Sequence, residues 1–187
     1  DYLYFNFMNI DLKGKVVLVT GASKGIGAAI AELIGQCGGK VALHANSNLS
    51  SAEQIARKIG NDSSAVQADL NDANATSKLY DQVFERYGRL DVLVNNAGVA
   101  ISSQLEVSNE RWVEDWQKTM NVNLLAAAIL CKQALPEFKR QGGGIIINIS
   151  SRAAHRGDTS DYLAYAASKG GMESLTKSLA RAYGKEN

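Results

Sequence analysis

A tyrosine and a lysine near the end of the chain are the residues best placed to do chemistry. Tyr165 and Lys169 stand four residues apart, so on a helix their side chains project from one face, about one turn from each other. An ammonium held near a phenol favours the phenolate, which allows proton exchange near neutral pH. The spacing predicts that Tyr165 acts as a general acid or base, although solvated helices without chemistry use the same spacing.

A second stretch whose residues could take part in chemistry covers residues 20–27, with the sequence Thr-Gly-Ala-Ser-Lys-Gly-Ile-Gly. It separates an apolar run of strand length from a segment with helical periodicity. Glycines at such a junction permit a tight turn and let backbone amides at a helix start approach a phosphate. The stretch therefore predicts a pyrophosphate site, with a plain strand-to-helix turn as the simpler alternative.

The elements that must position these residues alternate along the chain. Strands are expected at residues 15–20, 40–45, 65–68, 92–95 and 145–149, and helices at residues 25–37, 50–59, 76–87, 109–140 and 162–183. Strands that are apolar throughout, each followed by a helix, indicate a parallel sheet covered on both faces. Right-handed crossovers then predict a doubly wound α/β sheet in the order 3-2-1-4-5. We expect a bend or break at Pro136, the only proline.

Composition narrows the class of protein. The chain has 187 residues, 45% of them hydrophobic, and a formal net charge of +1, which predicts one globular domain and argues against a nucleic-acid partner. No apolar run reaches the length of a membrane span. Cys37 and Cys131 stand at unrelated positions, which predicts reduced, buried thiols in a cytoplasmic protein. His44 and His155 are the only histidines, so no metal site is expected. Residues 1–11 are set apart as disordered or foreign to the natural chain.

Three motifs, in this order, resemble signatures of the short-chain dehydrogenase/reductase family. They are Thr-Gly-x-x-x-Gly-x-Gly at 20–27, Asn-Asn-Ala-Gly at 95–98 and Tyr-x-x-x-Lys at 165–169. The resemblance extends from about Leu12 to the end and implies a single Rossmann domain, residues 12–187, that binds NAD(P). It also implies that the last two strands of the family fold are absent, so that the domain is truncated at its C-terminus.

The resemblance also assigns roles to individual residues. It implies a catalytic set made of Asn123, Ser151, Tyr165 and Lys169. Hydride passes between nicotinamide and a carbonyl carbon, Tyr165 exchanges a proton with the substrate oxygen, and Ser151 donates a hydrogen bond to it. The lysine holds the nicotinamide ribose, and the asparagine binds a water that connects the lysine to solvent. Ser150 is the alternative to Ser151 as the catalytic serine. Asn121 lies close to Asn123 in the sequence and is expected to be structural.

The charge after the second strand predicts which dinucleotide binds. An acidic residue there binds the ribose of NAD and would repel the 2′-phosphate of NADP. This chain has Asn46 and Ser47 instead, and Lys24 in the glycine loop could reach the phosphate, so NADP(H) is expected before NAD(H). A solvated loop lysine is the simpler interpretation of Lys24, and Asn95 is expected to be structural. The residues expected at the cofactor are Gly21, Ser23, Lys24, Gly25, Ile26, Gly27, Asn46, Ser47, Asp69, Leu70, Asn96, Ala97, Gly98, Tyr165 and Lys169.

Within the family, the glycine loop and the ending of the second strand are most similar to the 3-oxoacyl-[acyl-carrier-protein] reductase-like group. We therefore expect an NADP(H)-dependent oxidoreductase of ketones and secondary alcohols, with 3-oxoacyl thioesters as one substrate class. A sugar, polyol or cyclic ketone is the alternative substrate. A nucleotide-binding protein without turnover is the alternative of another class. The resemblance also implies a small-molecule substrate, no membrane partner, and a homodimer or homotetramer.

Overall fold

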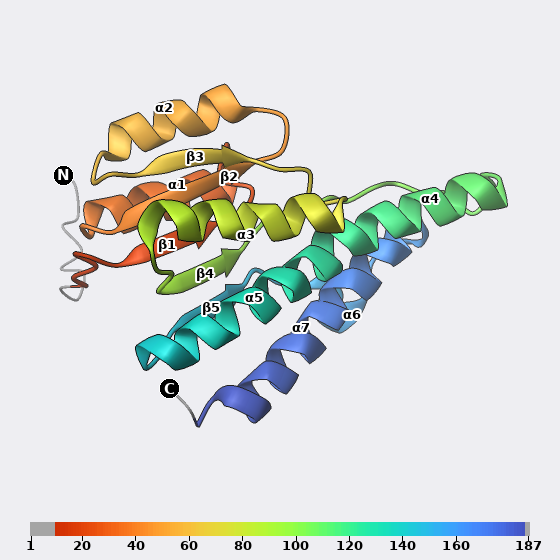
Figure 1. Ribbon diagram of the computed structural model, residues 1–187. Helices are drawn as coiled ribbons and strands as arrows, with labels where there is room; N and C mark the ends of the chain where they lie inside the picture. Colours follow the sequence, from red (N-terminus) through yellow and green to blue (C-terminus); the bar gives the residue numbers. More distant parts are fainter. Residues whose placement is uncertain (1–9, 186–187) are drawn as a thin grey trace, which may run out of the picture.

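Five parallel strands form the centre of the protein. The structure is a computed structural model that describes residues 10–185. The five strands make one sheet in the order β3-β2-β1-β4-β5, with helices on both faces (Figure 1). The strands are β1 (Val16–Val19), β2 (Lys40–Ala45), β3 (Ser64–Gln67), β4 (Val92–Asn95) and β5 (Ile145–Asn148). The predicted doubly wound α/β fold and its strand order are confirmed. Residues 1–9 of the segment that was set apart lie outside the described residues.

Nine helical segments connect or extend the strands within residues 10–185. They are α1 (Gly25–Gln36), α2 (Leu49–Ile59), α3 (Ala73–Tyr87), α4 (Asn109–Met120), the π-helical turn η1 (Asn121–Leu125), α5 (Ala126–Gln141), α6 (Ala153–Arg156), the 3-10 turn η2 (Ser160–Tyr162) and α7 (Leu163–Tyr183). No helix in the described part of the chain is long and apolar enough to cross a membrane.

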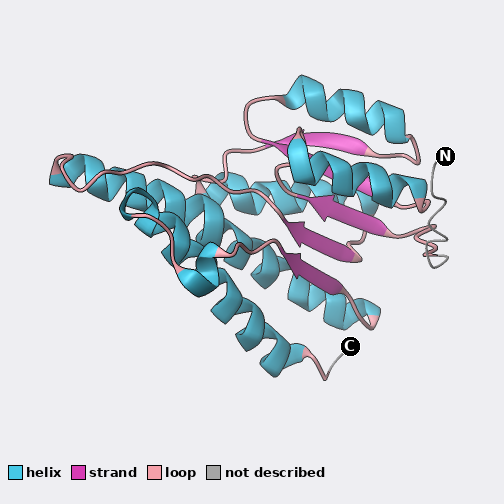
Figure 2. Ribbon diagram, turned by 180° about the vertical axis from the view of Figure 1, so that it is seen from behind, coloured by secondary structure: helices cyan, strands magenta, loops and turns pink. Residues whose placement is uncertain are grey.

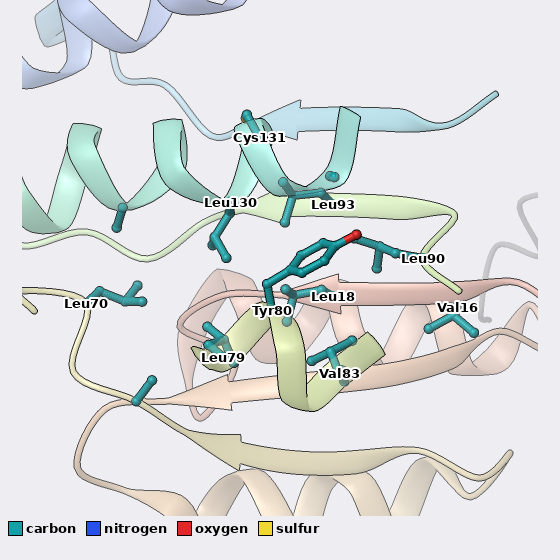
Figure 3. Close-up of a cluster of buried hydrophobic side chains, with 14 of the residues drawn as sticks. Val16, Leu18, Leu70, Leu79, Tyr80, Val83, Leu90, Leu93, Leu130 and Cys131 are labelled. Atoms are coloured by element: carbon teal, nitrogen blue, oxygen red, sulfur yellow. The ribbon is translucent and has the colours of Figure 1, made fainter. Parts of the chain in front are cut away.

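One hydrophobic core lies on each face of the sheet, because alternate side chains of a strand point to opposite faces. Val17 and Val19 of β1 join the core beneath α1 and α2. Leu18 joins the opposite core, where Tyr80 of α3 and Leu130 of α5 pack over the sheet (Figure 3). The two cores fix the strand ends relative to one another, and those ends carry the candidate site.

Some expectations about the elements are wrong. No break occurs at Pro136, which lies inside α5, and this helix continues to Gln141. The proline is exposed, so the carbonyl that loses its partner can bond water. The irregularity in this helical region is instead the π-helical turn at Asn121–Leu125. β5 is an edge strand that is not covered on both faces, since Ile145 is 56% and Ile147 43% exposed.

Two smaller corrections concern single segments. Cys131 is buried as expected, but Cys37 at the end of α1 is only partly buried. The segment between Ser151 and Tyr165, which the sequence suggests is a loop, contains α6 and η2, separated by a turn at Gly157 with φ of 77°. This folded segment packs along α7 through α6 and therefore places Ser151 beside the helix that carries the tyrosine.

Candidate active site

The candidate residues gather at the carboxyl edge of the sheet, where all five strands end (Figure 2). The residues converge there because the strands are parallel, so the loop that follows each strand begins at the same edge of the sheet. The five loops contribute, in chain order, the glycine loop of residues 20–27, Asn46, Asp69, Gly98 and Ser151. The first two turns of α7 add the tyrosine–lysine pair.

The glycine loop needs its glycines for two separate reasons. Gly21 and Gly25 have positive φ angles of 64° and 58°, which residues with a Cβ rarely adopt. A Cβ on Gly21 would also lie 2.9 Å from the Cα of Ala97, and a Cβ on Gly27 would collide with the carbonyl of Gly21. The loop is therefore folded tightly between the end of β4 and the first turn of α1.

The first turn of α1 is open to an anionic ligand. No side chain caps it, and it holds no acidic residue, so its free amides and the helix dipole face outward. Lys24, Gly25 and Ile26 are exposed, Ile26 by 64%, and a Cβ added to Gly25 would meet nothing within 4 Å. These features fit a pyrophosphate and an overlying ring system, which would cover the exposed isoleucine.

The Asn-Asn-Ala-Gly segment binds the loops to one another. Asn96 Nδ2 donates to the carbonyls of Thr20 at 2.8 Å and Gly21 at 3.2 Å. Thr20 Oγ1 accepts from the amides of Asn96 and Ala97 at 2.9 and 3.0 Å. Asn95 Nδ2 donates to Asn148 Oδ1 at 2.8 Å and joins the ends of β4 and β5. The Asn96 amide nitrogen is thus engaged in loop contacts, and Thr20 is a site residue whose role sequence reasoning missed.

Lys169 is a buried cation without a counter-ion. Its residue is 3% exposed, and its Nζ donates to the carbonyl of Ile149 at 2.7 Å. Within residues 10–185 no carboxylate pairs with it. Burial lowers the pKa of Lys169, because desolvation disfavours the charged form. Nζ lies 6.0 Å from the ring centroid of Tyr165, so the structure brings the pair together as the helical spacing predicted.

Asn123 joins this pair from the π-helical turn, where it is fully buried. Its Oδ1 accepts from the Val99 amide at 2.7 Å, and its Nδ2 donates to the Val99 carbonyl at 2.9 Å and to Ser168 Oγ at 3.0 Å. Ser168 Oγ in turn donates to the Tyr165 carbonyl at 2.7 Å. A Cβ on Gly98 would lie 3.4 Å from Asn123 Oδ1 and 3.6 Å from the nearby lysine Nζ, so both groups border this glycine.

The two consecutive serines after β5 differ in their partners. Ser151 Oγ accepts from the Ala153 amide at 3.2 Å, and its hydroxyl hydrogen remains available for a ligand. Ser150 Oγ donates to Glu173 Oε1 at 2.8 Å, and the same carboxylate oxygen lies 2.9 Å from His155 Nε2. The hydroxyl hydrogen of Ser150 is therefore committed to α7.

The chain matches the short chain dehydrogenase family over residues 15–187. It belongs to this family. A 3beta-hydroxysteroid dehydrogenase 1 of Eggerthella lenta is 39% identical over 178 residues, which cover 92% of this chain and 66% of that protein. A D-threitol dehydrogenase of Mycolicibacterium smegmatis is 38% identical over 176 residues, covering 92% and 66%. A probable galactose dehydrogenase of Rhizobium meliloti is 37% identical over 180 residues, covering 95% and 69%. The chain therefore spans about two thirds of the length of these relatives.

Solved structures show the same fold with either dinucleotide. A metagenomic short-chain oxidoreductase in complex with NADP superposes with a TM-score of 0.85 at 36% identity, covering 94% of this chain and 79% of the other. An NADH-dependent reductase complexed with NAD gives a TM-score of 0.85 at 28% identity, covering 96% and 77%. The fold of this short-chain dehydrogenase is thus one that holds nicotinamide dinucleotides in similar proteins.

The remaining sequence-predicted residues of this short-chain dehydrogenase are spread along the same edge. Asn46, Ser47 and Asp69 are exposed after β2 and β3. Leu70 is 5% exposed and belongs to the core beside α3, so only its backbone could reach a ligand. Asn121 Nδ2 donates to Asn71 Oδ1 at 3.2 Å and points to the β3–α3 loop instead of the lysine.

Two further residues were missed by sequence reasoning. Ser168 directly precedes the lysine of the Tyr-x-x-x-Lys motif, and a hydroxyl three residues after the tyrosine was a signal that it could bond the helix backbone. The sequence predicts no metal site at His44 and no other role for it. The histidine is 1% exposed and hydrogen bonded to two loops, and nothing in the sequence pattern of β2 distinguished it from its apolar neighbours.

Proposed function

We propose that this protein is an NADP(H)-dependent oxidoreductase that transfers hydride between nicotinamide and a ketone or secondary alcohol. The observation that carries the proposal is the buried ammonium of Lys169 beside the ring of Tyr165, at the sheet edge that also bears the uncapped start of α1. A cation without a counter-ion is costly to bury, so its retention supports a chemical role. The bound nicotinamide would supply or accept the hydride.

The chain's own residues handle the proton and the substrate oxygen. In reduction the Tyr165 hydroxyl donates its proton to the carbonyl oxygen, and in oxidation it receives one. Lys169 uses one of its three donors on the Ile149 carbonyl, which leaves two for the nicotinamide ribose hydroxyls. Its positive charge favours the phenolate that remains after proton donation.

Ser151 and Asn123 complete the proposed catalytic set. The free hydroxyl hydrogen of Ser151 donates to the same substrate oxygen, where negative charge develops. The bond between Ser150 and Glu173 supports the assignment of this role to Ser151. Asn123 fixes Ser168 and the segment after β4, and its Oδ1, with one lone pair still free, can hold a water beside the lysine.

The preference for NADP(H) rests on the charges around the expected 2′-phosphate. No carboxylate directly follows β2, where Asn46 and Ser47 are exposed, and the exposed Lys24 offers a cation from the glycine loop. We expect Lys24→Ala to weaken NADPH about fivefold and NADH much less, since a solvated charge–phosphate contact is worth about 1 kcal/mol. Asn46→Asp should reverse the preference. Equal losses for both dinucleotides in Lys24→Ala would remove the phosphate contact from the proposal.

Two substrate classes are proposed. The similarity of the glycine loop to 3-oxoacyl-[acyl-carrier-protein] reductase-like proteins supports a 3-oxoacyl thioester. The names of the curated relatives, which act on a hydroxysteroid, a tetritol and a hexose, support the sugar, polyol or cyclic ketone alternative. Turnover with NADPH on a 3-oxoacyl thioester and a cyclic ketone, and with NADP⁺ on a polyol and a sugar, separates the classes.

Separate measurements of binding and turnover test the proposal. NADPH binding is followed by the fluorescence of the cofactor, and turnover by its absorbance with each substrate of the panel. We expect both binding and turnover of at least one substrate class. Binding without any turnover would favour a nucleotide-binding protein instead of an enzyme, and absence of binding would contradict the proposal as a whole.

A homodimer or homotetramer in the cytoplasm is proposed as the state of the enzyme. Leu125 and Val113 are 45% and 57% exposed on the α4–η1 region, which supports a covered face in an assembly. The free thiols of Cys37 and Cys131 support a reducing compartment. Light scattering at working concentration would show a single subunit mass if the assembly is wrong.

A further inference from the structure

A histidine that the proposed mechanism does not use holds the glycine loop in place. His44, in β2, is 1% exposed. Its Nδ1 lies 3.0 Å from the amide nitrogen of Gly21, and its Nε2 lies 3.0 Å from the carbonyl oxygen of Ala68. An amide N–H can only donate and a carbonyl oxygen can only accept. The two partners therefore require a neutral ring that accepts at Nδ1 and donates from Nε2.

The backbone of the same residue adds a third contact to the loop. The carbonyl of His44 accepts from the Ala22 amide at 2.8 Å. Gly21 is thus bonded to β2 through its amide and to Asn96 through its carbonyl, at 3.2 Å. The same carbonyl occupies the space that a Cβ on Gly27, in the first turn of α1, would need. A shift of Gly21 would therefore be passed directly to the amides that are proposed to bind pyrophosphate.

We infer that His44 is a positioning residue for the dinucleotide site, and that protonation of its Nδ1 releases Gly21 and weakens cofactor binding. The inference rests on the proposed binding of NADP(H). A protonated ring turns an N–H toward the Gly21 N–H, and two donors cannot share a hydrogen bond, so the loop must move.

The surroundings of the ring set the pH at which this happens. Burial lowers the pKa of His44, while the Ala68 carbonyl and the Asp69 carboxylate act in the opposite direction, less strongly. Asp69 is the charged group that acts on the ring among residues 10–185. Affinity for the dinucleotide should therefore be constant around neutral pH and fall only in acid.

A pH series of NADPH binding tests the inference on wild type and His44→Asn. The asparagine oxygen can accept from Gly21 but takes up no proton, so this variant keeps the bond and loses the titration. As the pH falls from neutral through the lowered pKa of His44, we expect wild-type affinity to fall about three- to tenfold, the worth of one hydrogen bond. His44→Asn should bind within about threefold of wild type at neutral pH and lack that fall. The 2′-phosphate of NADPH titrates in the same range but affects both proteins alike, so only the difference between them counts.

Nitrogen-15 NMR of the wild-type rings gives a second readout that needs no folded variant at position 44. His44 and His155 are the only histidines, and a spectrum of His155→Gln identifies the His44 signals. We expect a ring protonated on Nε2 at neutral pH that titrates over the range in which affinity falls. A ring protonated on Nδ1, or a parallel fall of affinity in wild type and His44→Asn, would overturn the inference alone. Absence of NADPH binding at neutral pH would overturn the proposed function and the inference with it.

Discussion

Replacing Lys169 by methionine separates the cost of burying its ammonium from its use in the reaction. The lysine is 3% exposed and has one hydrogen bond, to the Ile149 carbonyl, and burial alone lowers its pKa. Methionine has a similar length and no charge, so Lys169→Met fills the same space without the desolvation cost. The variant loses the bond to Ile149, which costs about 1 kcal/mol.

The pH dependence of the free energy of unfolding gives the magnitude and the sign of the effect of burying the Lys169 ammonium. An unfolded lysine keeps its proton up to about pH 10.4, whereas folded Lys169 releases it at lower pH. Between the folded and unfolded pKa values the unfolded state binds more protons, so the free energy of unfolding rises with pH, by at most about 1.4 kcal/mol per pH unit. Lys169→Met lacks this contribution. At neutral pH we expect its free energy of unfolding within about 2 kcal/mol of wild type, instead of the loss of about 3–5 kcal/mol that breaking a buried ion pair causes.

Urea unfolding at a series of pH values from neutral to about pH 10 measures the free energy of unfolding at neutral pH and its change with pH. Lys177→Met, at an exposed position of the same helix, is the control for the loss of one lysine and should keep the wild-type slope. Turnover by Lys169→Met should fall at least about 100-fold, because the general acid loses its neighbouring charge. The reasoning is refuted if Lys169→Met unfolds with the same pH slope as wild type, or is destabilised by more than about 3 kcal/mol at neutral pH.

Three further outcomes follow from the contacts of the site. Ser151→Ala should lower kcat about 100- to 1000-fold and Ser150→Ala only a few-fold, since only the first removes a donor to the substrate oxygen; similar losses in steady-state assays would contradict the assignment. Asn123→Ala leaves the amide and carbonyl of Val99 without partners, so the free energy of unfolding measured in urea should fall by about 2–5 kcal/mol. A fall below about 1 kcal/mol would be inconsistent with the hydrogen bonds between Asn123 and Val99. Because the pKa of folded His44 lies below 6.5, the unfolded state binds more protons in acid, and the free energy of unfolding should fall by at most about 1.4 kcal/mol for each pH unit from 6.5 down to the folded pKa. If His44→Asn shows the same dependence of its free energy of unfolding on pH in acid as wild type, this expectation is wrong.

The sequence was sufficient for the sheet because periodicity reports burial. Every strand of the predicted order lies within one residue of its expected bounds, and the helical spacing of Tyr165 and Lys169 survives in the fold. It was insufficient where one residue outweighs a pattern. Pro136 removes one hydrogen bond from its helix, and whether water can replace that bond depends on exposure, which cannot be read from the local sequence.

Contacts between distant loops were the other part that the sequence could not supply. The hydrogen bond that Gly21 donates to His44 joins residues 23 positions apart, and the one that Ser150 donates to Glu173 also spans 23 positions. Hydrophobic periodicity carries no information about such pairs, because the partners meet only when the tertiary fold brings distant segments together. The different partners of Ser150 and Ser151 could therefore not be predicted from the sequence.

The turnover of Tyr165→Phe tests the central claim most directly. NADPH oxidation with the best carbonyl substrate is compared among wild type, Tyr165→Phe and Tyr162→Phe, a tyrosine of the adjacent turn, with NADPH affinity measured for each. We predict unchanged affinity and a kcat about 100- to 10,000-fold lower in Tyr165→Phe alone, because a single hydroxyl supplies the proton. A Tyr165→Phe enzyme with wild-type kcat would contradict the account.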